Sequence, residues 1–327
     1  GVRGLADRSR APKHIPHKTS RRTAQRLIAL RQRYPSWGPE RLAVHFRLGC
    51  SRSAAARILR EAGLTRRRRK KRVRNDLRAQ KASLRPFEKL QVDVKELGDI
   101  PAYARYMASE GLPGYLYSVR ELRTGGAWFA FARSNDTWHA HLFADYVLGH
   151  LAACGVDLSG TTVQTDNGSE FIGSTRKVRG GPTLFERTVE HYTGRMPVTI
   201  FPGSKTSQSD VEAFHRLVED EFLAVEDLSS RRRLLGCGRI YQAYFNHHRR
   251  LLWKGGKTPV GFFRAAQAEG HQPAALPEAF TLPPILLDDL ERFLPATGYH
   301  VPVLVTQVQS LSKYRHMVST WWVGVCV

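Results

Sequence analysis

The feature that most constrains this chain is a run of seven adjacent cationic residues at positions 66–72. Neighbouring positive charges repel one another, so this segment cannot lie inside a fold and divides the chain in two. Residues 1–80 carry 24 basic and four acidic side chains, whereas the remaining residues carry 27 and 25. This asymmetry predicts a polyanion-binding front part followed by a nearly neutral body, and it excludes a uniformly basic coat.

Length and composition exclude several classes of protein. With 327 residues, 42% of them hydrophobic, the chain can form two or three small domains. It has no run of 18 apolar residues and no apolar signal segment, so we expect no membrane association and a cytoplasmic location. Its cysteines are far apart and form no CxxC pair, which argues against a disulfide scaffold or a cysteine zinc site. Because the chain begins at Gly1 and not at Met, we also expect an upstream piece.

The front part is predicted to contain an extended basic arm at 1–20 and an all-α domain at 21–64. Apolar spacing indicates a helix that ends before Pro35, a second from Pro39 to Arg47, and a third that is capped by Ser51 and closed by Gly63. This is the pattern of a helix-turn-helix domain, and a structural bundle is the alternative. In the DNA-binding interpretation, the third helix presents three arginines to a groove: Arg52, Arg57 and Arg60.

The segment 65–85 is predicted to be a basic linker. It is a solvated tether in one interpretation and a phosphate-contacting tether in the other, and the two are compatible. Its candidate DNA-contacting residues are Arg66, Arg67, Arg68, Arg69, Lys70, Lys71 and Arg72.

From Pro86 the pattern changes to that of a mixed-sheet α/β domain, which we place at 86–265. Three antiparallel-type strands precede a helix, and strands then alternate with helices. The predicted strands cover 89–97, 115–122, 127–133, 161–165 and 197–201, and the predicted helices cover 137–153, 208–223 and 231–246.

Three acidic residues stand out in this α/β segment. Asp93 lies in the middle of an apolar strand, where an unpaired carboxylate costs several kcal/mol. Asp166 ends the fourth strand, and a simple Asp-Asn-Gly turn is the alternative explanation for it. Glu212 lies in the helix after the fifth strand, and an intrahelical ion pair with Arg216 would also explain it.

Taken together, carboxylates on adjoining strands and a facing helix can converge. Hard oxygen donors without a nearby His or Cys set suit Mg²⁺ or Mn²⁺ and not Zn²⁺. Two such ions activate a nucleophile and stabilise the leaving oxygen of a phosphodiester, which agrees with a polyanion-binding front part.

Three blocks resemble the catalytic blocks of the DDE transposases in the retroviral-integrase superfamily, with bacterial insertion-sequence transposases as the most similar group. These blocks are LQVDVKEL, VQTDNGSEF and SDVEAFHRLVEDEF. The segments GLADRSRAP, YPSWGPERLA, ILREAGL and YFNHHRRLLWKGGKTP agree with the resemblance, which covers about residues 1–265.

The resemblance implies a ribonuclease-H-like core that binds two Mg²⁺ ions, which Mn²⁺ can replace. Asp93 would bridge both ions, and Asp166 and Glu212 would each hold one. The protein would nick DNA at element ends and transfer the freed 3′-OH to target DNA as a homo-oligomer. Asn167 and Gly168 would shape the second block, Arg216 would contact DNA, and His215 would contact DNA or be an ordinary helix-surface histidine.

The chain departs from the family pattern in the spacing of its second and third acids. Asp166 and Glu212 are separated by 45 residues, and we interpret 176–192 as a surface insertion. Glu212 is preferred as the third acid because it opens the helix beside the loop; the other candidates are Glu186, Glu190, Glu219 and Glu221. The C-terminal extension, 266–327, has no predicted fold.

Two other functions remain open on the sequence. A nuclease of the same fold would nick DNA but not join strands. A decayed or repurposed copy would bind DNA without catalysis. No glycine-rich nucleotide-binding loop is present, so we expect no nucleotide cofactor.

Overall fold

The computed structural model describes residues 18–65, 77–173, 181–201 and 208–290. It divides the chain into two compact units, residues 1–71 and 72–327, which are described separately below. The cationic run 66–72 and most of the arm 1–20 lie outside the described residues. Within the part that is described, no helix is both long and apolar enough to cross a membrane.

The first unit consists of three short helices, α1 (Arg21–Arg33), α2 (Pro39–His45) and α3 (Arg52–Glu61). Two of them begin at a serine cap: the Ser20 hydroxyl accepts from the Thr23 amide at 3.1 Å, and the Ser51 hydroxyl accepts from the Ala54 amide at 3.2 Å. Such a cap satisfies an amide that has no partner inside the helix. The three helices and the Ser51 cap are therefore where the apolar spacing placed them.

An aromatic cluster holds the first unit together. The Tyr34 and Trp37 rings stack with their centroids 4.7 Å apart, and the guanidinium of Arg41 lies 3.7 Å from the centre of the Trp37 ring. Leu27, Leu42 and the α3 side chains Ala55, Ile58 and Leu59 complete the core. The apolar side of α3 is thus buried, and its arginines lie on the other side.

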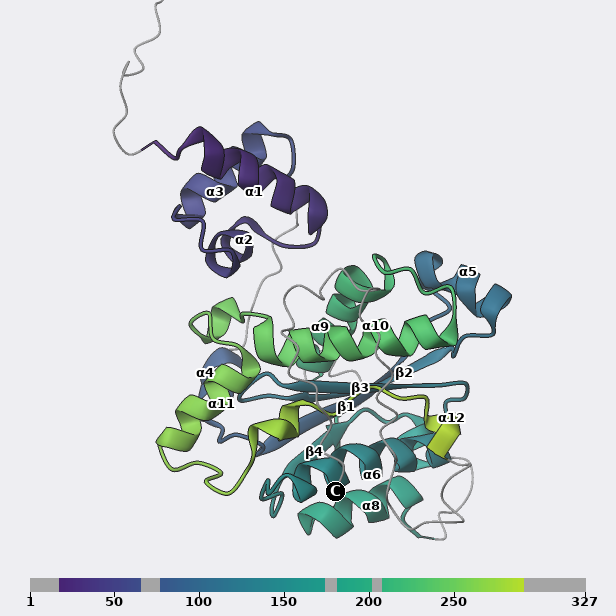
Figure 1. The fold of residues 1–327 in the computed structure, drawn as a ribbon. Coiled ribbons are helices and arrows are strands. Elements are labelled where there is room, and N and C mark those ends of the chain that lie inside the picture. The colour runs from purple at the N-terminus through teal and green to yellow at the C-terminus, as the bar shows by residue number, and fades with distance from the viewer. Residues whose placement is uncertain (1–17, 66–76, 174–180, 202–207, 291–327) are drawn as a thin grey trace, which may run out of the picture. The chain divides into compact units, whose positions relative to one another are not determined.

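The second unit is built on a five-stranded mixed sheet (Figure 1). Its strands are β1 (Lys89–Glu96), β2 (Tyr115–Glu121), β3 (Ala127–Ala132), β4 (Thr162–Thr165) and β5 (Val198–Thr199), in the order β3-β2-β1-β4-β5. Strand β2 is antiparallel to both β1 and β3, whereas β4 is parallel to β1 and β5 is parallel to β4. The predicted mixed-sheet α/β class is therefore confirmed, although β5 is shorter than predicted.

One face of the sheet is apolar. Leu90, Val92, Tyr117, Val119 and Trp128 point into the same buried cluster, as expected for alternate positions on paired strands. Helices α6 (Thr137–Ala153) and α8 (Leu184–Thr193) cover this face (Figure 1). The bounds of α6 agree with the predicted helix.

The opposite face of the sheet buries polar and aromatic side chains. It is covered by α9 (Ser209–Val218) with the π-helical turn η2 (Glu219–Leu223), and by α10 (Arg231–Ala243) with the π-helical turn η3 (Tyr244–His248) (Figure 1). Phe129 of β3 contacts rings from both helical segments, with centroids 6.2 Å from Phe214 and 6.4 Å from Tyr241.

Shorter elements surround the sheet. Three lie before or within the strand region: α4 (Leu77–Ser83), α5 (Pro101–Glu110) and α7 (Ser169–Ile172). The others follow η3: η4 (Leu252–Lys254), α11 (Pro259–Ala268), η5 (Pro277–Phe280) and α12 (Leu287–Leu290). Because α4 forms within the predicted linker 65–85, that linker is not wholly irregular.

Two sequence expectations are corrected by the packing. The predicted surface insertion 176–192 contains most of α8, whose Phe185 and Val189 are buried in the core; 174–180 lie outside the described residues. The core also continues past the predicted boundary at 265, because Ala279, Phe280 and Leu287 pack beneath the sheet. The Phe131 amide donates to the Ile285 carbonyl at 2.8 Å, so this late segment also covers the β3 edge.

Candidate active site

Asp93 lies on the polar face of the sheet, two residues after Gln91 on β1. Its side chain is 18% exposed, and its Oδ1 accepts a hydrogen bond from the Val94 amide at 3.0 Å. Val92 and Val94 on either side point to the other face, since side chains alternate along a strand. The local sequence therefore places one carboxylate beneath α9.

Asp166 is brought beside Asp93 by the strand register. Gln91 of β1 pairs with Gln164 of β4, and the two strands are parallel. Asp93 and Asp166, each two residues after the paired glutamine, are therefore neighbours. The turn that follows fixes the carboxylate, because the Gly168 amide donates to Asp166 Oδ1 at 2.9 Å. Asn167 joins this turn to the end of β5 through its Nδ2, which donates to the Ile200 carbonyl at 2.8 Å.

Glu212 is supplied by the first turn of α9. The helix is fastened to β1 next to the site, since the Val211 amide donates to Gln91 Oε1 at 3.2 Å. Val211 and Phe214 are buried against the sheet, whereas Glu212 is exposed. Among the described residues, Glu212 and Arg216 form no ion pair, so the alternative explanation of Glu212 has no support.

The three predicted acids interact electrostatically. Burial is the largest cause that raises the pKa of Asp93 to about 7; the charge of Asp166 contributes to this rise, and the Val94 hydrogen bond opposes it. The charges of Glu212 and Glu170 act in the same direction as that of Asp166. The Asp93 carboxylate therefore lies where negative charge accumulates and added positive charge would be stabilised.

Glu170 is a member of this cluster that the sequence reasoning missed. It lies in α7 and is 8% exposed. A Cβ on Gly168 would lie 2.6 Å from the Glu170 carboxylate, so a side chain at position 168 would displace that group. The available signal was its place in the same block as Asp166, four residues downstream.

His215 packs against Asp93 beneath α9. Its side chain is 7% exposed, and its Nδ1 lies 3.6 Å from Asp93 Oδ2. Burial lowers the pKa of His215 to about 3, with the charge of Lys95 acting in the same direction, so the ring is neutral near pH 7. The expectation of a helix-surface histidine is wrong, because position 215 lies on the buried side of α9.

The other candidates for the third acid have separate roles or positions. Glu186 forms a capping box with Thr183 at the start of α8, and Glu221 accepts both hydrogen bonds of a bidentate pair with Arg249 at 3.0 Å. Glu190 is exposed on α8, and Glu219 begins the π-helical turn after α9. Arg216, the predicted DNA contact, is exposed on α9.

The donor chemistry of this cluster fits a hard divalent cation. Its members are carboxylates, and the negative charges of the others act on the buried Asp93. A bound Mg²⁺ or Mn²⁺ ion would offset this repulsion. Throughout the described ranges, however, no three His, Cys, Asp or Glu side chains are already grouped closely enough to hold a metal ion. Binding would therefore require the carboxylates to move toward a shared ion.

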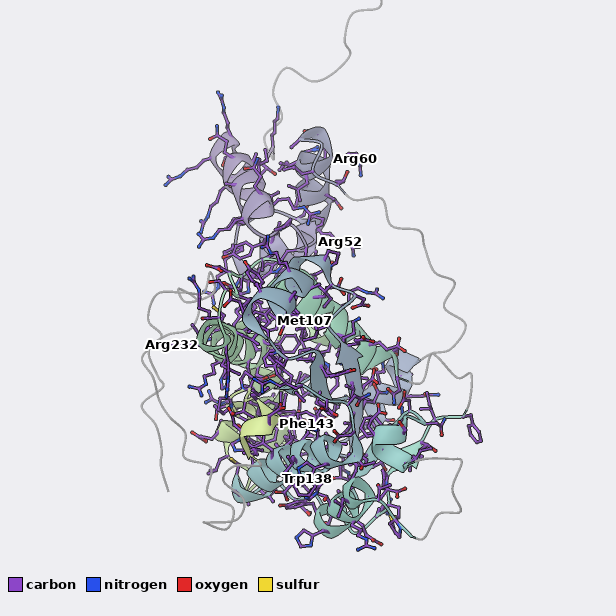
Figure 2. The ribbon with its side chains drawn as sticks, turned by 90° about the vertical axis from the view of Figure 1, so that its right-hand side faces the viewer. Arg52, Arg60, Met107, Trp138, Phe143 and Arg232 are labelled. Atoms are coloured by element: carbon purple, nitrogen blue, oxygen red, sulfur yellow. The ribbon has the colours of Figure 1, made fainter. Side chains whose placement is uncertain are left out.

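The predicted DNA-binding arginines of the first unit are exposed. Figure 2 shows Arg52 and Arg60 on α3, and Arg57 lies between them in the sequence. The side chains of Arg52 and Arg57 are 74% and 55% exposed, and they form surface ion pairs with Glu40 at 3.4 Å and Glu61 at 3.9 Å, respectively. Such pairs contribute little stability, so these arginines are available to a polyanion.

Comparison with known proteins gives a weak structural likeness. No family model matches the chain, and no curated protein matches it. Among solved structures, it is similar to a chain in the cryo-electron microscopy structure of the simian T-cell lymphotropic virus intasome in complex with the PP2A regulatory subunit B56 gamma. The TM-score is 0.32 at 17% identity, over 59% of this chain and 58% of that chain. A likeness at that TM-score does not support a function, so the function is inferred from the site.

Proposed function

We propose that this chain is a DDE-type transposase or integrase, which nicks DNA at element ends and transfers the freed 3′-OH to target DNA. The observation that carries the proposal is the electrostatic effect of two carboxylates on a third, all from separate elements: the charges of Asp166 and Glu212 both raise the pKa of Asp93. These are the three acids that the sequence predicts.

The sheet supports the same assignment at the level of the fold. Three antiparallel strands followed by two parallel ones are compatible with a ribonuclease-H-like core, in which β1, the end of β4 and the helix after β5 supply the acids. In this chain those elements carry Asp93, Asp166 and Glu212, respectively.

Asp93, Asp166 and Glu212 would hold two Mg²⁺ or Mn²⁺ ions. When bound there, the metal supplies Lewis-acid activation of the attacking oxygen and charge stabilisation of the leaving oxygen. The protein residues hold and orient the reacting groups: the Gly168 amide fixes Asp166, and the Gln91 side chain fixes the first turn of α9.

DNA is the proposed partner because the positive charge is concentrated before the catalytic unit. Exposed arginines on α3, together with the cationic run 66–72, would contact phosphates and position the duplex. Joining two element ends to a target also requires more than one active site, so we propose a homo-oligomer on DNA.

The experiment is a nicking and strand-transfer assay on element-end DNA with Mg²⁺ or Mn²⁺. We expect Asp166→Asn and Glu212→Gln to lower the rate by at least about 100-fold, or about 2.7 kcal/mol in the barrier. Glu219→Gln is the matched control, since it removes one acid about two turns further along the same helical segment and should keep the activity.

The products separate the proposed function from its rivals. Joined strands identify a transposase or integrase, whereas nicks without joints identify a nuclease of the same fold. If the wild type binds DNA but its rate equals that of both site variants in Mn²⁺, the catalytic proposal is wrong and a non-enzymatic DNA-binding protein is the better explanation.

A further inference from the structure

A buried positive charge lies beneath the first part of α9. Arg120 of β2 is 5% exposed, and its guanidinium lies 5.0 Å from the centre of the Phe245 ring and 5.7 Å from that of Phe214. Burial lowers the pKa of Arg120 to about 10, and the negative charge of Asp210 opposes this shift more strongly than any other group. The guanidinium therefore remains charged at neutral pH and depends on an anion for compensation.

Asp210 is attracted by the charge of Arg120 and also forms an ion pair with a second cation. Its carboxylate forms an ion pair with the ammonium group of Lys81, and the two side chains are only 12% and 19% exposed. Lys81 belongs to α4, which is itself held to the sheet because Arg123 donates to the Ala82 carbonyl. Asp210 thus joins the first helix of the second unit to the helix that carries Glu212.

A third contact fixes the next residue of α9. The Val211 amide donates to Gln91 Oε1 at 3.2 Å, and Gln91 is directly opposite Arg120 in the β1–β2 register. Gln91 is 2% exposed, so this hydrogen bond is shielded from water. Residues 210 and 211 are therefore fastened to α4 and the sheet immediately before Glu212.

An acidic residue in the first turn of a helix is common, because it interacts favourably with the helix dipole. That explanation suits an exposed side chain. It does not account for a carboxylate that is largely buried and compensated by two cations from different elements. The arrangement orients the start of the helix in addition to stabilising it.

We propose that Asp210 is a positioning residue, whose ion pair with Lys81 and electrostatic attraction to Arg120 fix the first turn of α9 and hence the place of Glu212. We call Lys81, Arg120, Asp210 and Gln91 the α9 clasp. The catalytic role of Glu212 rests on the proposed function. The interactions that make up the clasp do not depend on that role.

The first test uses Asp210→Asn in the full chain. We expect the nicking rate to fall by about tenfold and the Mg²⁺ concentration for half-maximal rate to rise, because a misplaced ligand weakens both. Asp227→Asn is the matched control: it also neutralises an aspartate in an ion pair, with Arg233 at 2.9 Å, but its side chain is 50% exposed. The control should match the wild type in both measurements.

Lys81→Met tests the same contact from the other side and perturbs a less buried group. It should lower the rate in the same direction by less than Asp210→Asn does. The double variant should have the rate of Asp210→Asn alone, because two residues that act through one contact are not additive. Independent, multiplying effects would overturn the proposal.

Hydrogen exchange gives a readout that does not need catalysis. In Asp210→Asn and Lys81→Met, the amides of residues 211–213 should exchange faster, while those of β1 and α6 keep their wild-type rates. If the amides of residues 211–213 exchange at the same rate in Asp210→Asn, in Lys81→Met and in the control Asp227→Asn, the clasp does not exist. If the exchange changes as expected but the wild type does not nick DNA, the proposed function fails and the clasp stands.

Discussion

The face of the sheet under α6 and the face under α9 differ in the side chains that they bury. Under α6, the strands present Leu90, Val92, Tyr117 and Val119, which pack against an apolar helix face. Under α9, the alternate positions of β1 and β2 include the polar residues Gln91, Asp93, Ser118 and Arg120. The two sets alternate along the same two strands, so one backbone serves both faces.

This difference separates two tasks. Apolar burial stabilises the fold by about 25 cal/mol per Å² of surface removed from water. Buried polar and charged groups cost free energy unless they are paired, and Asp93 lies next to like charges. Burial of the apolar face therefore stabilises the fold. This stabilisation offsets the free-energy cost of holding charged groups in a defined arrangement on the polar face.

The largest expected effect comes from damaging the apolar face. Phe143 is fully buried in α6, with its ring centroid 5.7 Å from that of Tyr117, and Phe143→Ala should lower the free energy of unfolding by about 4 kcal/mol. Trp138→Ala is the control on the same helix, because Trp138 is 38% exposed (Figure 2). Urea unfolding followed by far-UV circular dichroism measures both. Equal losses would show that α6 is not the stabilising layer.

On the polar face, the next largest effect should come from splitting the buried Glu221–Arg249 pair. Arg249→Met leaves the Glu221 carboxylate, 1% exposed, without its cation and should cost about 3 kcal/mol. The double variant Glu221→Leu/Arg249→Met should recover most of that loss, since an apolar pair needs no compensation. The same urea experiment applies. A double variant less stable than Arg249→Met would mean that the pair supplies stability of its own.

Asp93→Asn should raise stability in metal-free buffer. The pKa of Asp93 is about 7 when folded and near 4 when unfolded, so the folded wild type keeps a proton that the unfolded chain has lost. Wild-type stability therefore falls as pH rises from 4 to 7. The variant should gain about 2 kcal/mol at pH 8 and nothing at pH 4.

Thermal unfolding at the two pH values, with and without Mg²⁺, measures this effect. Mg²⁺ should raise the midpoint of the wild type at pH 8 and should have less effect on Asp93→Asn, because binding to the folded state stabilises it. If the stability of Asp93→Asn differs from that of the wild type by the same amount at both pH values, the raised pKa of Asp93 is not the cause.

The smallest effect is expected at His215. The neutral ring lies 3.6 Å from Asp93 Oδ2, so His215→Leu should lower the nicking rate by about tenfold, or about 1.4 kcal/mol, without loss of stability. His215→Asn keeps a hydrogen-bond donor and should retain more activity. Rates equal to wild type in both variants would limit His215 to packing.

Much of the local structure could be predicted from the sequence. Short segments rich in apolar residues predicted β1, β2 and β3, and the bounds of α6 agree with prediction. Apolar spacing also gave the helices of the first unit and the Ser51 cap. These signals depend on neighbours within a few residues, which is why they could be found without the fold.

Burial was harder to predict. The α8 region has glycines and charges that are typical of a surface loop, yet Phe185 and Val189 complete the core beneath α6. Residues 275–290 belong to the C-terminal extension for which the sequence predicted no fold, yet the short elements η5 and α12 pack under the sheet. The sequence indicated no role for Glu170, and it predicted His215 to be a DNA contact or a helix-surface histidine; only their neighbours place both residues beside Asp93.

By itself, the sequence determined the division of charge, the order of most strands and helices, and the three acids proposed for catalysis, because these follow from residue type and short-range spacing. Only the tertiary structure decided which acids act on Asp93, that His215 is buried, and that Arg120 and Lys81 share Asp210. Those relations join residues far apart in the chain, and their energies depend on distance and exclusion from water, which the linear order of residues does not specify.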